Sequence, residues 1–116
     1  MNHLKLIIKN SNLITKKGNY FFNKSELKII LNLYAKMVSK GFWKDYALNI
    51  SKEEVSFNVY KRSSENAEFR ICKNFRLKNK NLKYFTSDSQ GNILNISTNL
   101  EELLNKTRWK NLKLVN

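Results

Sequence analysis

The feature that most constrains the fold is residues 22–41, a segment that carries the signals for both ends of a helix. Asn23 can cap the first turn, and the side chain of Glu26, three residues later, can accept a hydrogen bond from the Asn23 amide. Gly41 supplies the left-handed residue at which many helices end. We therefore predict an amphipathic helix over residues 24–40. Its apolar stripe has the three-and-four spacing of a helix and comprises Leu27, Ile30, Leu31, Tyr34, Met37 and Val38.

The rest of the chain predicts strands and one more helix. From Asp45 onward the apolar residues alternate, which is typical of half-buried strands. A final apolar pattern over 98–108 indicates a second helix, capped either by Thr98 with Glu101 or by Asn99 with Glu102. The expected strands are 46–50, 55–60, 68–72, 82–86 and 93–96.

These elements predict an α+β fold. A long amphipathic helix packs on a four- to five-stranded antiparallel meander sheet, and a short C-terminal helix follows. The short connections favour antiparallel pairing, because parallel strands need longer crossovers. The expected organisation is an N-terminal arm or hairpin over 1–19, a single domain over 20–108 and a C-terminal tail over 109–116.

The sequence predicts a cytoplasmic protein without a membrane span. Its one cysteine, Cys72, excludes an intramolecular disulfide and suits a reducing compartment. The apolar run 4–8 is interrupted by Lys5, and it is too short for a signal core or a membrane span.

We predict no enzymatic activity, no cofactor and no metal site. The single histidine, His3, stands far from Cys72 in the sequence, and the three glycines form no phosphate-binding loop. The basic neighbours of Cys72 are expected to lower its thiol pKa. An enzyme would require Asp45, Arg62, Glu65 and Arg70 to converge in one pocket.

Net charge is the composition figure with functional content. The chain has 22 Lys and Arg against 9 Asp and Glu, a formal net charge of +13. Such an excess attracts polyanions: nucleic acid, an anionic membrane surface or an acidic protein. A lysine-rich solvated surface produced by codon bias is the competing interpretation.

Basic residues concentrate in two stretches, and between Phe69 and Ser87 there is no acid. Cations near aromatic rings are what a nucleic-acid groove uses, so we predict a nucleic-acid or ribonucleoprotein partner. No sequence-reading motif accompanies them, which favours backbone contacts with little sequence readout. Ordinary solvated faces and surface ion pairs are the structural alternative. The candidate nucleic-acid-binding residues are Arg62, Arg70, Lys73, Arg76, Lys78, Lys80, Lys83, Lys106, Arg108 and Lys110.

A protein-interaction adaptor is the alternative function. It would use a sheet edge or an exposed aromatic anchor. The candidate aromatic residues are Tyr34, Trp43, Tyr46 and Tyr60.

A set of residues spread over much of the chain carries a family resemblance: Phe22, Leu27, Ile30-Leu31-Asn32-Leu33-Tyr34, Met37-Val38, Gly41, Trp43-Lys44-Asp45-Tyr46-Ala47, Phe57, Val59, Arg62, Ser64-Glu65, Arg70-Ile71, Gly91 and Ile93-Leu94. In these residues the chain resembles a family of short bacterial proteins known only as a domain of unknown function. The likeness covers roughly residues 20–105, and it implies one compact bacterial domain without carrying over any site residue. The chain departs from the family in its lysine-rich loop at 78–83 and in using Lys and Asn where Arg and Ala are expected.

Overall fold

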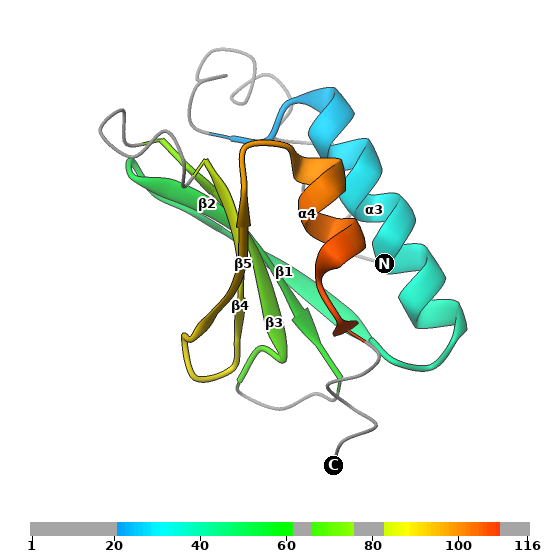
Figure 1. Cartoon of the computed structure of the whole chain (residues 1–116). Coiled ribbons are helices and arrows are strands. Elements are labelled where there is room, and N and C mark those ends of the chain that lie inside the picture. Colours follow the sequence, from blue (N-terminus) through cyan, green and yellow to red (C-terminus); the bar gives the residue numbers. More distant parts are fainter. Residues whose placement is uncertain (1–20, 62–65, 76–82, 110–116) are drawn as a thin grey trace.

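A computed structural model describes residues 21–61, 66–75 and 83–109. Within these ranges the fold is α+β, with two helices and a five-stranded antiparallel sheet in the order β1-β2-β3-β4-β5 (Figure 1). The predicted fold class, the meander and the short C-terminal helix are therefore confirmed. The elements are α3 (Lys24–Ser39), β1 (Asp45–Ile50), β2 (Glu54–Tyr60), β3 (Phe69–Asn74), β4 (Tyr84–Asp88), β5 (Ile93–Ser97) and α4 (Leu100–Lys106).

Both ends of α3 follow the sequence signals. The Asn23 side chain accepts a hydrogen bond from the Glu26 amide at 2.8 Å, and Glu26 Oε1 accepts one from the Asn23 amide at 2.7 Å. Gly41 has φ 81°. It lets the Gly41 and Phe42 amides turn back to the Val38 and Met37 carbonyl oxygens, both at 2.9 Å. The helix therefore ends in a Schellman motif, which satisfies carbonyls that would otherwise lack partners.

Both helices lie on the same face of the sheet, which we call the covered face (Figure 1). Phe57, Ile71 and Thr86 are aligned across β2, β3 and β4 and therefore share this face. The Tyr34 ring of α3 packs on Phe57, with centroids 5.8 Å apart. Thr107, directly after α4, shares a hydrogen bond with Thr86 at 3.1 Å. We call the opposite side of the sheet the distal face.

Aromatic rings fill the space between α3 and the covered face. Tyr46 stacks on Phe57 at a centroid distance of 4.6 Å, and Tyr34 meets Tyr46 edge to face at 4.9 Å. Trp109, assigned from the sequence to the C-terminal tail, is buried against Trp43 at 5.3 Å. Such ring pairs stabilise the fold by more than the burial of their apolar area alone would.

Two of the differences from the predicted elements bear on the site. β3 continues to Asn74, two residues beyond the predicted strand end, and this extension brings Lys73 onto the covered face. In α3 the buried face contains the charged residue Glu26, whereas Val38, expected in the apolar stripe, is 37% exposed. Glu26 is buried because it shares a helical face with Ile30.

Candidate functional site

A buried carboxylate fastens the start of α3 to the sheet. Glu26 is only 6% exposed, and its Oε1 accepts a hydrogen bond from Lys73 Nζ of β3 at 2.8 Å. The Tyr84 hydroxyl of β4 donates to Glu26 Oε2. Lys73 Nζ also donates to the Phe21 carbonyl oxygen at 3.1 Å. We call Glu26, Lys73 and Tyr84 the Glu26 cluster.

The polar atoms of the Glu26 cluster are engaged with one another. Burial, the hydrogen bond to Glu26 and the charge of Glu26 together raise the pKa of Tyr84, so the phenol stays protonated. The Lys73 side chain is 12% exposed and neutralised by Glu26. The Lys73 ammonium is engaged by Glu26 and the Phe21 carbonyl oxygen, so among the predicted nucleic-acid contacts Lys73 is less available than the exposed cations.

The other predicted nucleic-acid contacts stand on separate elements. Arg70 is exposed on the distal face, and Lys83 is exposed with its ammonium 5.4 Å from the Tyr84 ring centroid. Lys106 is exposed and donates to the Ile96 carbonyl oxygen at 2.8 Å, and Arg108 is exposed after α4. Residues outside the described part of the chain are Arg62, Arg76, Lys78, Lys80 and Lys110.

Three of the four candidate aromatic anchors are core residues. Tyr34, Trp43 and Tyr46 are 4%, 2% and 1% exposed. The expectation that these rings are exposed for a partner is therefore wrong. Trp43 and Tyr46 pack against Tyr34 because the chain turns at Gly41 and β1 then runs beneath α3. Tyr60, at the end of β2, is half-buried.

Sequence reasoning missed a row of lysines along α3. Lys24, Lys28, Lys36 and Lys40 occupy positions four residues apart, with Asn32 in the middle position. All five side chains are exposed. The only acid of α3, Glu26, is turned into the core, so this outer face carries positive charge alone. We call these four lysines the lysine row. Their regular spacing is visible in the sequence, but the pattern of this segment was interpreted only through its apolar stripe.

Cys72 differs from its predicted chemistry. The thiol lies on the distal side of β3 and is 1% exposed. Burial and the nearby charge of Glu54 raise its pKa to about 12, although Arg70 acts in the opposite direction. The prediction of a lowered thiol pKa is therefore wrong, because loss of hydration outweighs the basic neighbour.

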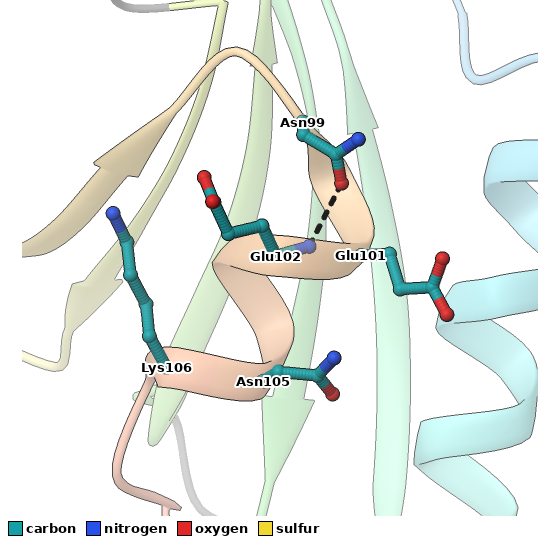
Figure 2. Close-up of a pocket in the computed structure, with 5 residues that line it drawn as sticks. All are labelled: Asn99, Glu101, Glu102, Asn105 and Lys106. Atoms are coloured by element: carbon teal, nitrogen blue, oxygen red, sulfur yellow. Dashed lines mark hydrogen bonds between the residues drawn. The ribbon is translucent and has the colours of Figure 1, made fainter.

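A hollow of about 510 Å³ lies beside α4, lined by Asn99, Glu101, Glu102, Asn105 and Lys106 (Figure 2). Its side chains do not converge. Glu101 and Asn105 point toward α3, and Glu102 and Lys106 point away from it. Asn99 caps α4 by accepting from the Glu102 amide at 2.9 Å. Glu102 accepts a hydrogen bond from the Ser97 hydroxyl at 2.7 Å, and Lys106 donates to the Ile96 carbonyl oxygen, so both charged groups link α4 to β5.

The described residues contain no group of three or more His, Cys, Asp or Glu placed to hold a metal ion. Within the same residues, no helix is both long enough and apolar enough to cross a membrane. The pocket required for an enzyme includes Arg62 and Glu65, which lie outside the described ranges, so that hypothesis stays a prediction.

Comparisons with known proteins give one match. No curated protein and no solved structure matches the chain significantly. A family model described as "Protein of unknown function (DUF2794)" matches residues 20–104, a range that runs from the residue before the described part of the chain into α4. The resemblance seen in the sequence is thereby confirmed, and the chain belongs to this family of proteins of unknown function.

Proposed function

We propose that this chain is a non-enzymatic nucleic-acid-binding protein that contacts backbone phosphates with little sequence preference. One observation carries the proposal. Of the twelve Lys and Arg residues among those described, Lys73 alone forms an ion pair, and the other eleven are all exposed. We further propose that it acts in the cytoplasm, where its buried free thiol would remain reduced.

Exposed and unpaired cations are the groups that bind a polyanion at low cost. An ammonium already paired with a carboxylate must give up that partner before it can meet a phosphate, whereas a solvated one only displaces water and counterions. Release of counterions from the nucleic acid then drives association and makes it strongly dependent on salt. The formal net charge of +13 adds long-range attraction.

A salt titration tests the proposal directly. Fluorescence anisotropy would measure binding of the full chain to labelled RNA and DNA of equal length and several sequences, from low to physiological salt. We expect a dissociation constant of about 10⁻⁴ to 10⁻⁶ M at physiological salt, as is typical of non-specific binding. The logarithm of affinity should fall linearly with the logarithm of salt concentration. Absence of binding to both RNA and DNA at low salt would reject the proposal.

The sheet edge supports the adaptor alternative. β5 is an edge strand among the described strands, and it exposes Ile93 and Ile96 to 51% and 41%. Exposed apolar residues on an edge strand favour addition of a partner strand. Co-purification from the native host separates the two functions. The adaptor predicts a protein partner that is lost in the double variant Ile93→Lys, Ile96→Lys and retained after nuclease treatment.

A further inference from the structure

The lysine row of α3 is the surface that best fits a polyanion. Its four lysines and Asn32 stand at every fourth residue, from Lys24 to the C-cap Lys40, so successive side chains are about 6 Å apart along the helix axis. Each step also turns about 40° around the axis, so over about 24 Å the row winds through about 160° of the exposed side of α3. All four ammonium groups lack an ion-pair partner among the described residues. No acid of α3 opposes them, because Glu26 is buried in the Glu26 cluster.

From this geometry we propose that the lysine row binds the phosphate backbone of a double-stranded nucleic acid. The inference rests on the proposed function and names its surface and its ligand class. One strand of a duplex presents a charge about every 3.4 Å along its axis, so a helix of this length spans several phosphates. Because the lysines wind through about 160° of the helix surface, they fit phosphates on both sides of a groove better than those of one strand alone. Of the two basic stretches that the sequence highlighted, the described cations Arg70, Lys83, Lys106 and Arg108 belong to other parts of the fold than α3.

The side chains on the exposed side of α3 favour a double-stranded ligand over a single-stranded one. Single-strand binders stack unpaired bases on aromatic rings. The exposed side chains of α3 contain no ring, since the one aromatic residue of the helix, Tyr34, is buried beneath it. Lysine and asparagine side chains can contact phosphates and groove edges, which a duplex presents without unstacking.

The buried face of α3 argues against a membrane as the ligand. An interfacial helix inserts an apolar face among the lipids while its basic face meets the headgroups. In α3 the central apolar residues Ile30, Tyr34 and Met37 are already packed in the core. The helix therefore offers charge without an apolar face to insert.

The test compares two variants that remove equal charge from different surfaces. The row variant replaces Lys24, Lys28, Lys36 and Lys40 with Gln. The control variant replaces Arg70, Lys83, Lys106 and Arg108 with Gln. All eight side chains are exposed, so both proteins should keep the wild-type circular dichroism and thermal midpoint. Binding to duplex DNA, duplex RNA, single-stranded DNA and vesicles of phosphatidylcholine with phosphatidylserine is then measured across salt concentrations.

We expect the row variant to lose at least tenfold in duplex affinity at low salt. Its plot of log affinity against log salt should be shallower by about 3 to 4, since each lost phosphate contact removes about 0.9. The control variant should lose much less. A row variant that binds duplex as tightly as the control variant would overturn the inference and leave the proposed function standing.

Other outcomes are equally decisive. Tighter binding of the wild type to single strands or to anionic vesicles than to duplex would overturn the choice of ligand. If the wild type binds no nucleic acid at low salt, the proposed function fails and the inference fails with it. A row variant that loses duplex binding but keeps its fold, beside a control variant that loses much less, supports both.

Discussion

The Glu26 carboxylate both caps α3 and pairs with a lysine of the sheet. Its Oε1 completes the capping box with the Asn23 amide and also accepts from Lys73 Nζ at 2.8 Å. Burying an ion pair costs hydration, so such a pair adds little net stability compared with an apolar replacement of both partners. What it does impose is position, because only one placement of α3 on β3 and β4 satisfies all the hydrogen bonds. Removing one partner is therefore costly.

Lys73→Met should lower the free energy of unfolding by about 3–5 kcal/mol, because it leaves the Glu26 carboxylate buried without a cation. Urea denaturation followed by circular dichroism measures the change. The matched control is Lys83→Met, which removes an exposed lysine and should change stability by less than about 0.5 kcal/mol. Equal stability of the two variants would contradict this account. Adding Glu26→Gln to Lys73→Met should recover part of the loss.

The Cys72 thiol should resist modification in the native protein. With its pKa raised to about 12 by burial, roughly one thiol in 10⁴ is ionised at pH 8, and the side chain is 1% exposed. A thiol-reactive disulfide reagent should therefore react at a rate limited by unfolding, and in full within seconds to minutes in denaturant. Fast reaction of the folded protein at pH 8 would show that the thiol is accessible and ionised.

At the scale of elements, the stability of α3 depends on the groups that cap its ends. The Asn23 side chain satisfies the Glu26 amide at 2.8 Å, and without it this amide at the first turn loses its partner. We expect Asn23→Ala to lower the free energy of unfolding by about 1 kcal/mol. Asn32→Ala is the control on the same helix: it replaces an exposed interior residue by a better helix former and should be neutral or slightly stabilising. Similar losses in both variants would mean that the cap contributes nothing.

Local signals in the sequence predicted the helices and strands, but they did not predict the contacts between those elements. The cap at Asn23, the end at Gly41 and the alternation in β2 are each encoded within a few residues, so they could be read directly. The partner of Lys73 could not, because Glu26 stands 47 residues away in the sequence. The register did contain a hint. Continuing the alternation of Phe69 and Ile71 by one step places Lys73 on the same face.

The candidate site was predicted less well than the fold for the same reason. Charge density along the sequence drew the interpretation to residues 70–83, but position in the sequence does not say which side chains face solvent. Folding turned Lys73 inward and left the lysine row of α3 outward. The predicted exposure of the aromatic candidates was wrong for the same reason. Trp43 is a residue type that often anchors a partner, but the turn after α3 places it in the core.

Across the whole molecule, buried phenol and thiol groups make stability depend on alkaline pH. Burial raises the pKa of Tyr46 from 10.0 to about 12 and that of Cys72 from 9.0 to about 12. It also raises the pKa values of Tyr34 and Tyr84. In the unfolded chain these groups lose their protons near their ordinary pKa values, while the native protein still holds them. The native state thus binds more protons, and stability must fall as pH rises.

We therefore expect the urea midpoint to be constant up to pH 8, to begin falling near pH 9 as the unfolded thiol ionises, and to fall more steeply above pH 10. The decline should continue until the native groups themselves titrate near pH 12. Cys72→Ala separates the contributions: without the thiol, the first part of the decline should disappear and the fall should begin only near pH 10, with the tyrosines. A midpoint that stays constant to pH 11 in both proteins would show that the buried hydroxyls and the thiol ionise as easily in the folded core as in water.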